Sequence, residues 1–147
     1  MIAEFIKRLT APDPAPFADA DARLALAALL VRIARADGVY APEERGRIDR
    51  VLAARYGLAS GDAAELRAQA EGVEAEAPDT VRFTRAIKDA VSYEERLQVI
   101  EALWEIVLAD GTRDDEEDAL LRMLAPMLGV SDRDSNLARQ SVEKRRQ

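Results

Sequence analysis

The chain has 147 residues, of which 48% are hydrophobic and 33% are charged, and its formal net charge is −7. This length suits a single domain with its own core, and the acidic balance argues against general binding to nucleic acid or an anionic membrane. Because the sequence has no Cys and no His, disulfides, thiolate or imidazole metal sites and Ser–His or Cys–His catalysis are excluded. Any bound metal must therefore be a hard cation held by oxygen.

The first segment, residues 1–16, is expected to form a short amphipathic helix followed by a Pro-rich connector. Packing of this helix on the core is favoured, and contact with a membrane surface is the alternative. The segment has no basic leader and is not typical of a signal peptide. The longest apolar stretch, residues 24–31, is far shorter than the roughly 20 residues that span a bilayer. We therefore expect a cytoplasmic protein without a membrane span.

One unit occurs twice in the chain. Residues 19–58 and 92–130 each contain a long apolar helix pattern, an Ala-Asp-Gly turn and an acidic start of a second helix. Asp37-Gly38 falls on Asp110-Gly111, and Glu43-Glu44 falls on Glu116-Glu117. This repetition predicts an internal duplication around two long central helices.

Helical patterns continue through the rest of the chain, and no segment alternates with the period of two that is typical of a strand. We therefore expect an all-α fold, a single bundle of about seven helices. After residues 1–16, we expect a long helix over 19–36 and a helix from Pro42 to Gly57. Helices from Ser60 and from Pro78 should follow, with a polar loop over 71–79 between them. The second half should contain a long helix over 93–109 capped by Ser92, a helix from 114 shortened by Pro126, and a helix within 131–147 capped by Ser131. The basic tail over 143–146 is expected to be a frayed, solvated helix end, and contact with an anionic partner is the alternative.

The two acidic turns match the second half of a calcium loop. In such a loop an Asp precedes an obligatory Gly, and a Glu closes the site one turn into the next helix. Asp37 with Glu44, and Asp110 with Glu117, have this spacing. Apolar residues and an Arg stand where the first half of the loop needs oxygen ligands, so a full EF-hand is excluded. Each copy is a half-site, and the two form one site only if the fold brings them together.

Helix capping is the competing interpretation of the same carboxylates. Acidic residues at a helix start are stabilised by the helix dipole by roughly 0.3–1 kcal/mol each without any metal. The aromatic residues give little further guidance: Trp104 and Phe83 are expected in the core, and Tyr40 is expected to be exposed within the first turn.

The run from Ala36 to Arg45, echoed over 109–117, resembles the TerB family of tellurite-resistance proteins, which includes the related domain of membrane-anchored DnaJ-like co-chaperones. The similarity extends over most of 19–130. It implies an all-helical bundle, a bacterial cytoplasmic protein linked to stress or tellurite resistance, and a divalent-cation role for the acidic turns. On that basis the candidate metal ligands are Asp37, Glu44, Asp110 and Glu117, with Glu43 and Glu116 as neighbours.

The leading hypothesis is a non-enzymatic module that holds a divalent cation, with calcium favoured, or recruits unidentified protein partners in a stress pathway. The first alternative is a metal-free interaction scaffold, which predicts an exposed apolar patch or a homodimer interface. The second is a carboxylate-dependent hydrolase. It ranks last because the chain has neither an imidazole nor a thiol, and no catalytic or organic-cofactor residue is assigned.

Overall fold

A computed structural model gives the structure of the chain and describes residues 7, 19–35, 38, 40–76, 84–85, 87–89, 91–108 and 115–145. Within these ranges the regular elements are all helical and no strand occurs, so the all-α fold class is confirmed. The helices are α2 (Asp19–Ala34), α3 (Pro42–Tyr56), α4 (Ser60–Glu76), α6 (Tyr93–Val107), α7 (Asp115–Met127) and α8 (Asp132–Arg145).

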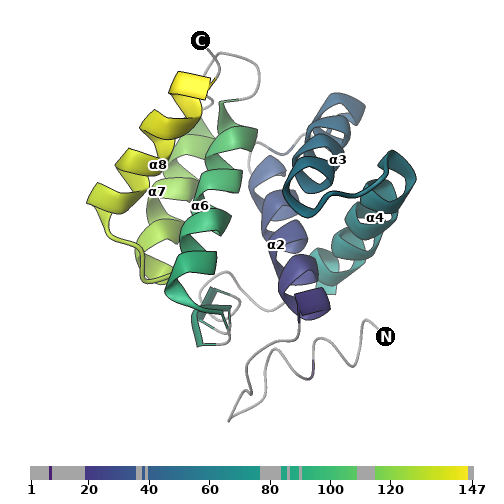
Figure 1. The fold of residues 1–147 in the computed structure, drawn as a ribbon, viewed down its shortest axis with the longest axis horizontal. Coiled ribbons are helices and arrows are strands. Elements are labelled where there is room, and N and C mark those ends of the chain that lie inside the picture. The colour runs from purple at the N-terminus through teal and green to yellow at the C-terminus, as the bar shows by residue number, and fades with distance from the viewer. Residues whose placement is uncertain are drawn as a thin grey trace.

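These helices form two groups of three. α2, α3 and α4 pack on one another, as do α6, α7 and α8. The groups meet where α2 contacts α6 and α7, and where α3 contacts α6. Figure 1 shows α2 and α6 next to each other at the centre of the bundle, running in the same direction. The two predicted central helices therefore occupy the middle of the fold.

The contacts follow the same plan in both groups. In each, the first helix packs on the second and the third, and the contact of α3 with α6 has its counterpart in the contact of α2 with α7. This arrangement agrees with two copies of one unit. The duplication itself stays a prediction.

The core is built mainly from α2 and α6, because apolar residues cover most of the circumference of both helices. α2 buries every residue from Ala25 to Val31, and Ile33 follows with no exposed surface. On α6 the largest buried side chain is Trp104, only 1% exposed, which confirms its predicted place in the core. Burial of a single Leu or Ile side chain contributes roughly 1.5–3 kcal/mol, so these two helices dominate the stability of the bundle.

The helix ends follow the local signals in the sequence. Pro42 opens α3, and Gly57 ends it in the left-handed conformation at φ 63°, where a side chain is disfavoured. Ser92 caps α6 by accepting a hydrogen bond from the Glu95 N–H at 3.3 Å, and Ser131 caps α8 by accepting from the Asp134 N–H at 3.1 Å. These predicted ends are confirmed.

The predicted loop over 71–79 is wrong for its first part, because α4 continues to Glu76. Two tertiary effects hold this polar stretch in a helix. Val73 is fully buried, and the Glu74 carboxylate pairs with Arg35 at 3.0 Å and Arg32 at 3.4 Å. A composition typical of a loop is overridden by packing on α2.

Other boundaries differ little. α2 and α6 each end two residues before the predicted ends at 36 and 109, which is within the usual fraying of a helix terminus. The elements expected within 1–16 and most of the helix expected from Pro78 lie outside the described residues, as does Phe83. In the described part of the chain, none of the helices has both the length and the apolar character needed to cross a bilayer.

Candidate functional site

Among the four predicted metal ligands, Glu44 is the one with a described side chain. Asp37, Asp110 and the side chain of Glu117 lie outside the described residues. Within the described ranges, no three acidic side chains gather as a metal site would require. The cation site therefore stays a prediction.

Glu44 lies in the first turn of α3. The residue before that helix, Ala41, is extended and offers no side-chain cap, and Glu43 and Glu44 place two acidic groups in the first turn. The Glu44 N–H bonds to the Ala41 carbonyl at 3.0 Å, and its side chain is half-buried. Because a polar capping side chain is absent at Ala41, these carboxylates supply the charge that the positive end of the helix favours.

Tyr40 fastens the turn before α3 to α4. Its hydroxyl donates a hydrogen bond to Glu71 Oε2 at 2.6 Å, and the guanidinium carbons of Arg35 and Arg45 lie 4.9 and 5.0 Å from its ring centroid. Burial, and then the hydrogen bond to Glu71, raise the pKa of Tyr40 well above its ordinary value. The expectation of an exposed Tyr40 is wrong, since α4 extends far enough to bring Glu71 to this ring and leaves it half-buried.

Arg67 links the same carboxylate to α3. Its guanidinium bonds Glu71 at 3.1 Å and Asp49 at 2.6 Å, with only 17% of the side chain exposed. The bond to Asp49 is the main reason that the pKa of Arg67 is raised. Tyr40, Glu71, Arg67 and Asp49 thus form one chain of hydrogen bonds from the turn through α4 to α3. We call this chain the Tyr40 network.

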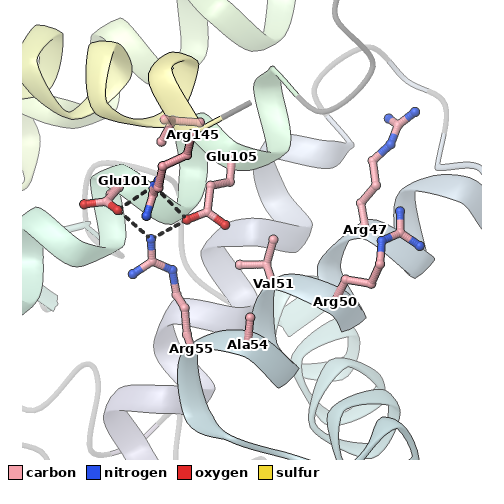
Figure 2. Close-up of a pocket in the computed structure, with 9 residues that line it drawn as sticks. Arg47, Arg50, Val51, Ala54, Arg55, Glu101, Glu105 and Arg145 are labelled. Atoms are coloured by element: carbon pink, nitrogen blue, oxygen red, sulfur yellow. Dashed lines mark hydrogen bonds and ion pairs between the residues drawn. The ribbon is translucent and has the colours of Figure 1, made fainter. Parts of the chain in front are cut away.

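A second feature is a groove of about 550 Å³ between α3, α6 and α8, shown in Figure 2. At one end, two carboxylates from α6 are shared by two arginines. Arg55 lies 2.6 Å from Glu105 and 3.5 Å from Glu101, and Arg145 lies 2.6 Å from Glu101 and 3.5 Å from Glu105. This cluster joins α3 to α6 and the end of α8. The described residues that line the groove are Arg47, Arg50, Val51, Ala54, Arg55, Glu101, Glu105, Val142 and Arg145.

The other end of the groove carries Arg47 and Arg50. Figure 2 shows both beyond Val51 and Ala54, apart from the cluster of carboxylates. No acidic side chain of the described residues pairs with either arginine. Among the described residues of the lining, four guanidiniums against two carboxylates give an excess of two positive charges, although the whole chain has a net charge of −7.

Sequence reasoning missed this groove because its lining comes from three helices distant in the chain. One signal was available: Arg47, Arg50 and Ala54 recur at helical spacing beside the apolar face of α3. The expectation of a frayed basic tail is wrong for Arg145, which lies within α8 and pairs with two carboxylates of α6.

The chain was compared with known proteins. Over residues 23–140 it matches the family described as "Tellurite resistance protein TerB". No curated protein and no solved structure matches it. The matched region runs from α2 into α8 and so includes both groups of helices and both acidic turns. The predicted resemblance is confirmed, and the chain belongs to the TerB family.

Proposed function

We propose that this TerB module is non-enzymatic and binds a divalent cation at its acidic turns, through Asp37 and Glu44 in the first turn and Asp110 and Glu117 in the second. We further propose that binding serves tellurite resistance, as the family description suggests, or a stress response more broadly. The observation that carries this proposal is the parallel placement of the two central helices.

α2 and α6 lie in contact and run in the same direction (Figure 1). In the sequence, Asp37 and Asp110 each follow the end of one of these helices by three residues. Three residues reach at most about 10 Å. The described ends of α2 and α6 thus lie at the same end of the bundle, which supports one shared site over two distant ones.

The Tyr40 network supports the first half-site. It ties the turn between Asp37 and Glu44 to α4 through the bond from Tyr40 to Glu71. A turn already held in place loses less conformational entropy when its oxygens close on an ion. Calcium suits carboxylates on a turn better than magnesium, because magnesium requires a strict octahedron and releases its water reluctantly.

Calorimetric titration of the full chain with calcium chloride tests this proposal. We expect binding with a modest affinity, weakened at least tenfold when Asp37→Asn and Asp110→Asn are combined. The matched control combines Asp89→Asn with Asp132→Asn, which changes the charge equally at two exposed positions outside the turns. Absence of binding at millimolar calcium, or equal losses in both double variants, would refute the cation role.

The same titration separates the alternatives. An interaction scaffold whose carboxylates only cap helices predicts no heat of calcium binding and a stability loss in Glu44→Gln that calcium does not change. A hydrolase predicts turnover that depends on these carboxylates, which a screen of ester and phosphoester substrates would reveal.

A further inference from the structure

We propose that the groove between α3, α6 and α8 binds a small phosphate-bearing molecule, and that Arg47 and Arg50 hold the phosphate. This site is separate from the acidic turns and does not depend on the cation proposal.

Charge is the first argument. The described lining of the groove has an excess of two positive charges in a chain whose net charge is −7. The hollow beside α2 and α4 differs in this respect, because its described lining holds three acidic groups, Asp21, Asp62 and Glu65, against the basic group of Arg23. A basic concavity on an acidic protein draws anions to one place, since field lines concentrate in a cleft with low-dielectric walls.

The arrangement of the arginines is the second argument. Arg55 and Arg145 are held by Glu101 and Glu105, whereas Arg47 and Arg50 have no acidic partner among the described residues. Positions 47 and 50 lie three apart on α3, so both side chains leave the same face of the helix. Two guanidiniums on one face offer several planar N–H donors to one phosphate, and arginine is well suited to this geometry.

Size and polarity argue for a compact ligand body. A volume of about 550 Å³ lies within the range of roughly 300–1,000 Å³ that is common for small-molecule sites. Val51 and Ala54 lie between the two arginines and the carboxylate cluster (Figure 2), and Val142 of α8 adds a third apolar side chain to the lining. Beyond it, Glu101 and Glu105 offer oxygens that accept hydrogen bonds from hydroxyl or amino groups. Nucleoside monophosphates combine a phosphate, an apolar ring face and such polar groups.

The lining is less suited to an acidic peptide. A helix docked in a groove is usually anchored by apolar side chains one turn apart over several turns. Here the apolar side chains of the described lining are three of small or medium size, Val51, Ala54 and Val142, which is too few for a row of anchors over several turns. A compact phosphorylated molecule is therefore the occupant that this groove favours.

Amide chemical-shift titration of the isotope-labelled full chain tests the proposal with adenosine monophosphate as the probe. We expect concentration-dependent shifts confined to 47–55, 101–105 and 142–145. Adenosine, which lacks the phosphate, should bind at least about tenfold more weakly, because it cannot form charge-assisted hydrogen bonds. Inorganic phosphate should shift mainly residues around Arg47 and Arg50.

Variants complete the test. Arg47→Gln combined with Arg50→Gln should weaken binding of adenosine monophosphate by about tenfold or more. Because neither arginine pairs with an acidic side chain in the described part of the chain, the fold should stay intact. The matched control is Arg122→Gln with Arg133→Gln, which removes the same charge from exposed positions outside the groove. Equal weakening in both variants, equal binding of adenosine, or shifts at the groove with polyglutamate but not with adenosine monophosphate would each overturn the proposal.

Discussion

The Tyr40 hydroxyl lies 2.6 Å from Glu71 Oε2 and donates a hydrogen bond to it. Tyr40 belongs to the turn that joins α2 to α3, whereas Glu71 lies on α4, so one contact ties together the three helices of the first group. Arg67 extends the contact to Asp49 on α3. The described residue Tyr40, just before α3, is therefore held by polar bonds as well as by apolar packing.

Removal of the Tyr40 hydroxyl should destabilise the chain. In Tyr40→Phe, Glu71 keeps its ion pair with Arg67 but loses the hydrogen bond that the neutral Tyr40 hydroxyl donates. We therefore expect the free energy of unfolding to fall by about 1 kcal/mol. For a chain of this length such a loss lowers the melting temperature by about 2–4 °C. Urea denaturation followed by circular dichroism measures the change. Tyr56→Phe is the control, because the Tyr56 hydroxyl bonds to none of the described residues; an equal loss there would contradict the role of the bond.

Alkaline pH should narrow the difference in the free energy of unfolding between the wild type and Tyr40→Phe. The folded-state pKa of Tyr40 is raised by burial and by the Glu71 hydrogen bond, while an unfolded tyrosine titrates near pH ~10. Above that pH the unfolded chain has released a proton that the folded chain retains, so the free energy of unfolding falls as pH rises. Tyr40→Phe lacks this titration. Urea denaturation at a series of alkaline pH values should show the two curves converging, and parallel curves would contradict the raised pKa.

The helices and their caps were predictable because each rests on local chemistry. Ser92, Ser131, Pro42 and Gly57 act within one turn of their own positions, and the apolar periodicity of 19–36 indicates a buried helix without reference to the rest of the fold. The end of α4 was not predictable in this way. Its last turns have a polar composition and are held by partners about forty residues earlier, such as Arg35 with Glu74.

The two candidate sites differ in the same way, because one rests on local spacing in the sequence and the other on contacts between distant helices. Spacing within a few residues predicts Asp37 and Glu44 as a half-site. The lining of the groove combines Arg47 from α3, Glu101 from α6 and Arg145 from α8, and no local pattern in the sequence predicts that these three helices lie side by side.

Two glycines, each following the second helix of its group, should respond differently to substitution. Gly57 ends α3 at φ 63°, and Gly129 follows α7 at φ 74°. A Cβ at Gly57 meets nothing within 4 Å, so Gly57→Ala should cost about 1 kcal/mol from the left-handed backbone alone. A Cβ at Gly129 would lie 2.5 Å from an Arg96 nitrogen that donates to the Leu128 carbonyl at 2.6 Å.

Because Arg96 must move to make room for the new Cβ, Gly129→Ala should also lose the hydrogen bond from Arg96 to the Leu128 carbonyl. The free energy of unfolding should therefore fall by about 2–3 kcal/mol in total. Thermal unfolding of the two alanine variants gives the comparison directly. If Gly129→Ala were no worse than Gly57→Ala, the Arg96 contact would contribute nothing to the end of α7.

Trp104 and Ser135 should be coupled across the α6–α8 contact. The indole Nε1–H donates to the Ser135 hydroxyl at 3.1 Å, and both residues are buried. Trp104→Phe removes the donor and part of the side-chain volume, so we expect a loss of about 2–4 kcal/mol. Ser135→Ala should cost about 1 kcal/mol. The double variant should lose less than the sum of the two, because the bond can be removed only once; strict additivity would show that the contact contributes no stability.

The two arginines that share Glu101 and Glu105 should contribute unequally to stability. Arg55 has 16% of its side chain exposed, whereas Arg145 has 54% exposed. An exposed ion pair contributes roughly 0.2–1 kcal/mol, and loss of one partner from a fully buried pair costs about 3–5 kcal/mol. Arg55→Gln should therefore cost about 1–2 kcal/mol, and Arg145→Gln less than about 1 kcal/mol. Added salt should reduce the effect of Arg145→Gln more than that of Arg55→Gln, because solvent ions screen exposed charges best. Equal effects of the two substitutions at low and high salt would mean that Arg55 acts as a surface residue and does not join α3 to α6.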